Sequence, residues 1–245
     1  MAVEKKANKP KGKSSGGSFF KKLSRFIIKA MLIFFISTIG VTLIYRFVNP
    51  PITWLMFQRW AFEGYGLEKD WVDMDEVPYY LPLAMISSED GKFMEHNGFD
   101  FAAIDKALKY NEKKAGKKIK GGSTISQQTA KNVFCWPQRS WVRKGFETYF
   151  TFLIEMLWPK QRIMEVYINV VELGPGVYGV EAASQKFWGK PARKISKKQA
   201  ALLAAVLPRP LKYNAQHPGP YVSRRANKIV RLIGTLPANH LEQDI

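Results

Sequence analysis

Residues 86–98 read ISSEDGKFMEHNG and bring together Glu89, Asp90, Glu95 and His96. The apolar residues 77–88 that precede Glu89 have a helical pattern, so this glutamate is expected at the end of a buried helix. A carboxylate beside apolar side chains can acquire a shifted pKa and act as an acid or a base. A solvated charged loop would have the same local pattern, so the segments that follow must decide between the two.

The segment GGSTISQQ at residues 121–128 predicts a tight turn followed by a helix. Its two glycines permit a turn with exposed backbone N–H groups, and residues 124–127 fit a capping box. Along the helix, Thr124, Gln128 and Lys131 fall at i, i+4 and i+7 and share one face. A hydroxyl, an amide and an ammonium in one row can grip a phosphate or a sugar, although an ordinary capped surface helix has the same spacing.

Residues 141–158 predict a longer helix that carries Arg143 and Glu147 at i and i+4, with Lys144 adjacent. An Arg–Glu pair at this spacing is usually a surface ion pair worth a few tenths of a kcal/mol. Much of this helix is nevertheless expected to be buried, because it is rich in large apolar side chains. These are Phe146, Tyr149, Phe150, Phe152, Leu153, Ile154 and Leu157.

The remaining pattern is mainly helical. Residues 100–114 place Phe101, Ile104, Ala107 and Leu108 on one side of a helix, and the Lys-rich residues 113–120 after it suggest a mobile flap. Further helices are expected at residues 159–169, 178–188, 200–207 and 221–236. No run of alternating strand-like residues is present, so the sequence predicts a mainly α domain.

The N-terminal region predicts a membrane anchor. Residues 1–25 form a basic tail, and residues 26–48 are apolar over a length that can cross a bilayer as a helix. Because the basic residues lie on the N-terminal side, that side is expected in the cytoplasm and residues 49–245 outside it. The Trp-rich residues 52–62 fit either the membrane interface or the first core helix of the domain.

The formal net charge of +18 suggests an anionic partner. Residues 1–25 hold eight Lys/Arg against one Glu, and the rest of the chain holds 30 Lys/Arg against 19 acidic residues, so the excess belongs to both parts. The one cysteine, Cys135, excludes an internal disulfide and reads as a small apolar residue between Phe134 and Trp136. No Cys/His cluster has the spacing of metal ligands.

Five segments, in this order, resemble the peptidoglycan glycosyltransferase family (glycosyltransferase family 51). The resemblance covers roughly residues 70–235 and shows no departure at a position with an expected chemical role. The K-T-G element of the transpeptidase domain that some members carry is absent. The matching segments are EDGKFMEHNG at residues 89–98, GSTISQQ at 122–128, RKGFE at 143–147, KQRIMEVYIN at 160–169 and RRANKIV at 224–230.

The resemblance implies a lysozyme-like α-helical glycosyltransferase domain behind one N-terminal transmembrane helix. The implied reaction joins lipid II to a growing glycan chain, with inversion and release of undecaprenyl diphosphate. Glu89 would be the catalytic base, and Glu147 a second catalytic glutamate in the donor site. The other residues implied in substrate binding are Asp90, Phe93, His96, Ser123, Thr124, Gln128, Lys131, Arg143 and Lys144.

Within this set, Lys131, Arg143 and Lys144 are expected to neutralise the diphosphate. Asp90, Phe93 and His96 could instead hold the loop that carries Glu89, and the residues leave both roles open. No cofactor is expected to be required, although a Mg²⁺ or Mn²⁺ ion on the substrate diphosphate is compatible with the sequence.

The expected partners are lipid II, the growing glycan and membrane lipid. Cell-division or elongation proteins are compatible but not identified by the sequence. The expected location is the bacterial inner membrane, single-pass, with a periplasmic catalytic domain. A lytic, lysozyme-like enzyme remains the alternative, since it also uses carboxylates on an α domain. A nucleic-acid-binding protein would explain the charge, but the anchor would place its domain on the wrong side of the membrane.

Overall fold

The computed structural model describes residues 16–114, 121–237 and 241. Most of the expected basic tail, residues 1–15, and most of the expected Lys-rich flap, residues 115–120, lie outside the described residues. The chain divides into two units, Met1–Leu43 and Ile44–Ile245, each of which is described by itself. The expected domain boundaries at residues 25 and 48 stay a prediction.

The first described element is the long helix α1 (Gly16–Phe47), which begins ten residues before the expected apolar stretch. Its portion Phe20–Phe47 is long and apolar enough to cross a membrane, with a mean hydropathy of 2.3 in its most apolar window. Only 6% of that window is buried, which a core helix of a soluble protein would not show. The helix therefore fits the expected single span.

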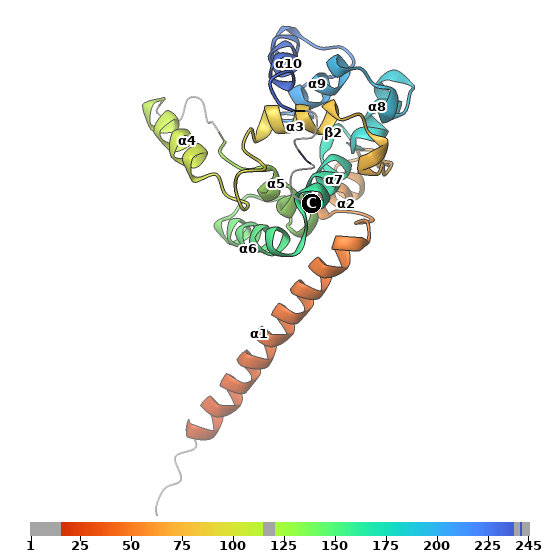
Figure 1. Cartoon of the computed structure of the whole chain (residues 1–245). Helices are drawn as coiled ribbons and strands as arrows, with labels where there is room; N and C mark the ends of the chain where they lie inside the picture. Colours follow the sequence, from red (N-terminus) through yellow and green to blue (C-terminus); the bar gives the residue numbers. More distant parts are fainter. Residues whose placement is uncertain (1–15, 115–120, 238–240, 242–245) are drawn as a thin grey trace, which may run out of the picture. The chain divides into compact units, whose positions relative to one another are not determined.

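The second unit is mainly helical (Figure 1). Several of its helices begin at a side-chain cap: the side chains of Thr53, Thr124 and Ser196 each accept a hydrogen bond from the third helical N–H. The helices are α2 (Trp54–Phe62), α3 (Tyr80–Glu89), α4 (Phe101–Lys113), α5 (Ile125–Phe134), α6 (Trp141–Leu157), α7 (Lys160–Val170), α8 (Val180–Trp188), α9 (Lys197–Val206) and α10 (Pro220–Ile233), with 3₁₀ turns at Met74–Glu76 and Ala192–Lys194.

A small sheet lies among these helices, and the sequence did not predict it. Its strands β1 (Glu68–Lys69), β2 (Glu172–Gly174) and β3 (Val177–Tyr178) are arranged in the order β1-β3-β2. β3 pairs parallel with β1 and antiparallel with β2. Gly176, in the turn between β2 and β3, has a φ of +70°, and a Cβ there would lie 2.2 Å from the Gly66 carbonyl oxygen.

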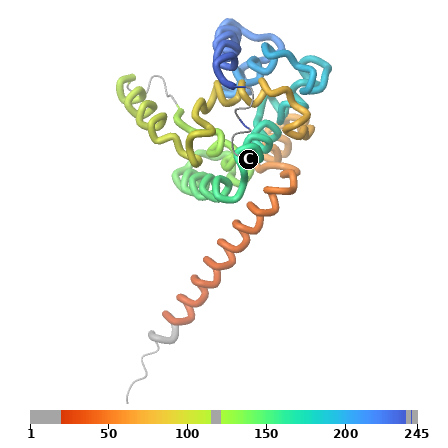
Figure 2. Tube along the Cα trace, in the orientation of Figure 1, coloured from red at the N-terminus to blue at the C-terminus, as the bar shows by residue number. Residues whose placement is uncertain are grey.

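The core consists of two groups of helices. α9 packs against α3 and α10, and its alanines Ala200, Ala201, Ala204 and Ala205 are fully buried, which permits close approach of its neighbours. α5 packs against α6 and α7, and α7 is buried along nearly its whole length. Figures 1 and 2 show α4 standing away from both groups.

Two apolar helix faces are partly exposed. α4 and α6 are both helices, as predicted, but Phe101 and Leu108 of α4 are exposed. Much of α6 was expected to be buried; Phe150, Leu153 and Ile154 are buried, whereas Phe152 is exposed. α2 is a helix whose Met56 is fully buried, as in a core helix, whereas Trp54 and Trp60 are exposed; its place at the membrane interface stays a prediction.

Asn169 of α7 ties the segment before α3 to the core. Its side chain is fully buried, accepts from the Val72 N–H at 2.9 Å and donates to the Val72 carbonyl at 2.8 Å. The side-chain amide thus acts in place of a neighbouring strand for an otherwise buried backbone.

Asn169→Ala should lower the free energy of unfolding by about 2–4 kcal/mol, because it leaves both polar groups of Val72 buried without a partner. Urea denaturation followed by circular dichroism measures the change. Asn227→Ala, at an exposed position on α10, is the matched control and should change stability by less than about 0.5 kcal/mol. Equal effects of the two substitutions would contradict this role of Asn169.

Candidate active site

Glu89 is the last residue of α3, and its carboxylate is held from two sides. Its Oε1 accepts a hydrogen bond from Arg225 Nη2 of α10 at 2.9 Å, and its Oε2 accepts from Gln128 Nε2 of α5 at 3.2 Å. Ser88 Oγ lies 3.1 Å from Oε1. The carboxylate is therefore fixed at the meeting point of three helices while its side chain remains partly exposed.

Tyr167 sets the direction of the Gln128 amide. The Tyr167 hydroxyl donates to Gln128 Oε1 at 3.3 Å, which leaves the amide NH₂ to donate to Glu89. Burial raises the pKa of Tyr167 well above its usual value, and the charges of Glu89 and Asp90 raise it further. Tyr167 therefore stays protonated and remains a donor at neutral pH.

Asp90 fastens the loop after Glu89 to the start of α5. Its Oδ2 accepts from the Ile125 backbone N–H at 2.9 Å, and both of its oxygens lie within 3.1 Å of His96 Nε2. Nearby, Thr124 Oγ1 donates to the Gly98 carbonyl at 2.7 Å. An acidic side chain at a helix N-terminus is favourable because it meets unpaired N–H groups and the positive end of the helix dipole.

Phe93 and His96 belong to the support of this loop. Phe93 is fully buried, and the Lys160 ammonium lies 4.6 Å from its ring centre. Lys160 also donates to the His96 carbonyl at 2.6 Å. Phe93 is thus a core residue in this structure, and its expected role in substrate binding stays a prediction. Of the two roles left open by the sequence, the buried packing favours support of the loop.

Glu147 forms a second acidic position, on α6. Its side chain is buried and pairs with Arg143 Nη1 at 2.7 Å and with Lys144 Nζ at 2.5 Å. The sequence left open an ordinary surface ion pair, and the burial excludes it. The side chain is instead held by two cations, as a buried carboxylate requires.

Lys131 of α5 adds a third cation to this group. Burial lowers the pKa of Lys131, the nearby Glu147 carboxylate opposes that effect, and the Arg143 and Lys144 cations reinforce it. Lys131 follows Gln128 by three residues, a rise of about 4.5 Å along α5. α5 therefore carries Gln128 beside Glu89 and Lys131 near Glu147.

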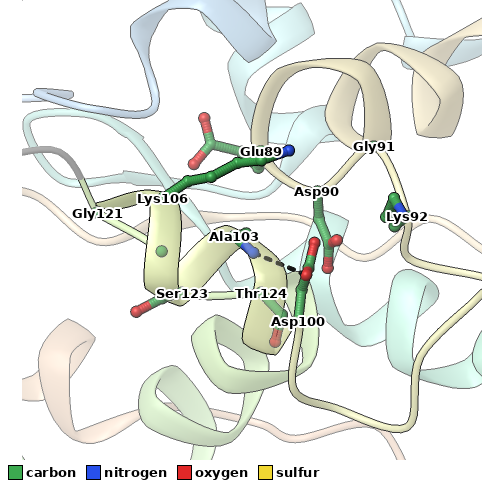
Figure 3. Close-up of a pocket in the computed structure, with 11 residues that line it drawn as sticks. Glu89, Asp90, Gly91, Lys92, Asp100, Ala103, Lys106, Gly121, Ser123 and Thr124 are labelled. Atoms are coloured by element: carbon green, nitrogen blue, oxygen red, sulfur yellow. Dashed lines mark hydrogen bonds between the residues drawn. The ribbon is translucent and has the colours of Figure 1, made fainter. Parts of the chain in front are cut away.

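Two neighbouring pockets open at these positions. The first, of about 290 Å³, is lined by Glu89, Asp90 and Lys106 together with the turn at residues 121–124. Figure 3 shows the Lys106 side chain extending from α4 across this pocket toward Glu89. The second, of about 240 Å³, is lined by the apolar side of α4, by Gln127 and by Lys144. Both are lined by Gly122 and Ser123, so the turn expected to bind substrate separates them.

Gly122 is required at this turn by close approach. A Cβ there would lie 3.2 Å from the Ile104 Cα of α4. Thr124, the next residue but one, has its hydroxyl engaged by Gly98 and by the cap of α5, so it shapes the turn and leaves Ser123 as the exposed hydroxyl.

Some residues of the site were not singled out from the sequence. Arg225 lies 136 positions from Glu89, within the fifth matching segment. Tyr167 lies within the fourth. The order of the segments could have suggested both, but their contacts could not be read from sequence spacing. Among the described residues, no group of three or more His, Cys, Asp or Glu side chains could hold a metal ion.

Comparison with known proteins identifies the family. Residues 58–233 match the protein family described as Transglycosylase. The chain belongs to the transglycosylase family. It is similar to a biosynthetic peptidoglycan transglycosylase of Bdellovibrio bacteriovorus, 53% identical over 221 residues that cover 88% of each chain. Proteins described in the same words are 50% identical in Caulobacter vibrioides, covering 90% of this chain and 95% of the relative, and 48% identical in Bacteroides thetaiotaomicron, covering 89% of each.

The lowered pKa of Lys131 has a consequence for the stability of this transglycosylase. The fold disfavours the charged form of Lys131, so its charge lowers stability at neutral pH. That loss disappears as the pH rises from the lowered pKa in the folded state to about 10.4 in the unfolded state. Lys131→Met should therefore be at least as stable as the wild type at pH 7, and its advantage should shrink with rising pH.

Urea denaturation at several pH values between 7 and 10 measures this difference. Lys228→Met, at an exposed position of α10, is the control and should show no such trend. A Lys131→Met advantage that grows with pH would contradict the lowered pKa.

Proposed function

We propose that this protein polymerises lipid II into β-1,4-linked glycan strands and so builds peptidoglycan for the cell wall. The observation that carries the proposal is the pairing of two acidic positions along one face of α5. Glu89 is partly exposed beside an open pocket, whereas Glu147 is surrounded by three cations. A base on one side and a site for a dianionic leaving group on the other are what this transfer needs.

Glu89 is the proposed general base. It would accept the proton of the acceptor sugar's 4-hydroxyl as that oxygen attacks the anomeric carbon of the donor. The bond from that carbon to the diphosphate breaks on the opposite face, so the α-linked donor gives a β-linked product and undecaprenyl diphosphate leaves. Arg225 and Gln128 would aim the carboxylate, because each already donates to one of its oxygens.

The two pockets support separate acceptor and donor positions. The pocket beside Glu89 would take the acceptor sugar, and the pocket beside Lys144 would lie toward the donor. The Gly122–Ser123 turn, which lines both, would place its backbone and hydroxyl groups against the sugar or diphosphate oxygens. Glu147 would act within the donor position by holding Arg143 and Lys144 in the orientation that a diphosphate needs.

Lys131, Arg143 and Lys144 would neutralise the leaving diphosphate without a resident cofactor. Three cations against the one carboxylate of Glu147 leave a surplus of positive charge, which favours an anionic ligand. A Mg²⁺ or Mn²⁺ ion that takes part would bind through the oxygens of the substrate diphosphate.

Synthesis is favoured over cleavage. A lytic enzyme also needs carboxylates, but it has no diphosphate to neutralise, so the cationic group around Glu147 would have no function in it. The similarity to proteins described as biosynthetic transglycosylases points the same way. With lipid II as substrate, the excess positive charge of the chain needs no nucleic-acid partner.

The proposed location is the bacterial inner membrane, with the N-terminus in the cytoplasm and the catalytic unit in the periplasm. The orientation is supported by the eight Lys/Arg residues within residues 1–25. A membrane-bound enzyme suits a substrate whose prenyl chain stays in the bilayer. Cell-division or elongation proteins are proposed only as a class of partner.

Glu89→Gln tests the proposed base. It keeps the shape and hydrogen-bonding size of the side chain but cannot accept a proton, so the rate of lipid II polymerisation should fall by about 10²–10⁴-fold. Gel separation of polymer made from labelled lipid II measures the rate. Glu95→Gln, in the same loop but exposed and paired with Lys92, is the control and should retain activity.

An unfolding midpoint close to that of the wild type would show that Glu89→Gln folds. A folded Glu89→Gln protein that polymerises lipid II at the wild-type rate would remove Glu89 from the role of base.

A further inference from the structure

The positive charge that follows residue 25 is concentrated near the C-terminal end of the chain. Residues 182–241 hold 12 Lys/Arg and no Asp or Glu. Taking these 12 from the 30 Lys/Arg of residues 26–245 leaves 18, against 19 acidic residues, so the remainder is nearly neutral. The whole positive excess outside the basic tail therefore belongs to the one segment that contains α9 and α10.

Four exposed cations of this segment lie together. Arg224, Lys228 and Arg231 fall at i, i+4 and i+7 of α10 and share one face, on which residues three or four apart have Cβ atoms about 5–6 Å from each other. Lys198 of α9 joins them, because it donates to the side chain of Asn227 on the same face. We call Lys198, Arg224, Lys228 and Arg231 the cationic face.

The cationic face is not neutralised by the acidic side chains that the structure describes. Of the 12 cations in the segment, Lys186 pairs with Glu68 and Arg225 pairs with Glu89. No described carboxylate lies within ion-pair distance of the four residues of the cationic face. Neighbouring like charges repel each other, so an unneutralised group of this kind suits a surface that binds an anionic partner.

α10 connects the cationic face with the active site. Arg225 donates to the Glu89 carboxylate at 2.9 Å, whereas Arg224, the residue before it, is exposed on the other side of the helix. The cationic face is therefore separated from the Glu89 position by the thickness of one helix. A polymer that extends from the site is long enough to reach it.

An aromatic pair continues the cationic face at the start of α10. Tyr221 precedes Arg224 by three residues and is 45% exposed, and its ring is stacked on that of Tyr213 with ring centres 5.0 Å apart. A tyrosine has an apolar ring and a polar hydroxyl, which suits a partner with both kinds of surface, such as a sugar. One side of α10 thus presents aromatic surface and then positive charge.

The position of α10 argues against membrane lipid as the partner. The last turn of α1 belongs to the second unit, where Arg46 donates to the Leu157 carbonyl at the end of α6 and Arg162 of α7 donates to the Tyr45 carbonyl. Figures 1 and 2 show α10 on the other side of this unit from α6. A bilayer around the span meets the unit where the span ends, and the cationic face is remote from that place.

We propose that the cationic face and Tyr221 bind the glycan strand through the carboxylates of its peptides. The proposal rests on the proposed function: lipid II carries a pentapeptide on its disaccharide, so its polymer has a carboxylate-bearing peptide at every repeat. Several weak ion pairs along one strand reinforce each other, because the first contact raises the effective concentration of the next. The strand would thus be held beside the active site, outside both pockets.

Strand binding tests the proposal without any reaction. The full chain in detergent would be titrated into fluorescently labelled glycan strands that bear pentapeptides but no lipid, with fluorescence anisotropy as the measurement. Lys228→Glu combined with Arg231→Glu should weaken binding at least tenfold. Lys109→Glu combined with Lys113→Glu, at exposed positions of α4, changes the net charge by the same amount and should weaken binding less than twofold. Unfolding midpoints close to that of the wild type would show that both variants fold.

Glycan strands whose carboxylates have been converted to amides are the matched control on the ligand. They should bind the wild type at least tenfold more weakly than unmodified strands. Equal binding of unmodified strands by the wild type and by the Lys228→Glu, Arg231→Glu variant would overturn the proposal. Equal binding of amidated and unmodified strands by the wild type would also overturn it, because the carboxylates would then not be recognised.

Polyglutamate of similar charge separates a glycan from an acidic protein as the partner. The wild type should bind polyglutamate at least fivefold more weakly than the strands, and Tyr221→Ala should weaken only the binding of strands. Polyglutamate bound as tightly as the strands would overturn the proposal and assign the cationic face to an acidic protein. A protein that binds strands through this face but makes no polymer from lipid II would contradict the proposed function alone.

Discussion

The site depends on the contacts that Asp90 makes with the start of α5. Asp90 follows Glu89 directly, and its carboxylate binds the Ile125 N–H and His96 at once. Because Gln128 is one turn further along α5, this contact fixes the distance between Glu89 and its amide partner. Lys160 supports the same loop, because it donates to the His96 carbonyl and lies against the Phe93 ring. The contacts within residues 89–98 therefore mainly hold Glu89 in position.

The second constraint is electrostatic. Burying Glu147 would be costly without Arg143 and Lys144, because an unpaired buried charge loses its hydration. The fold nevertheless brings in Lys131 as well, whose lowered pKa shows that the surroundings disfavour another positive charge. Under the proposed function, the charge of Lys131, which burial disfavours in the free protein, would become favourable when a diphosphate binds. Burying the Lys131 charge lowers the stability of the free protein, and binding of an anionic substrate there would offset that loss.

The helices of the fold could be predicted from their apolar period, and several of them also from a side-chain cap, as at Thr124 and Ser196. The strands could not, since segments of two or three residues have no period to detect. Periodicity also indicates an apolar face without saying what covers it, which is why Phe152 was expected in the core. Glu89, Glu147 and the face of α5 could be proposed in advance, but the contact between Arg225 and Glu89 joins residues 136 positions apart and only the fold creates it.

The most direct test of the account is incubation of the purified full chain with labelled lipid II, followed by gel separation and digestion with lysozyme. We expect a polymer that lysozyme degrades, together with one undecaprenyl diphosphate released for each new glycosidic bond. Cleavage of preformed glycan without polymer formation from lipid II would contradict it and would assign the two glutamates to a lytic reaction.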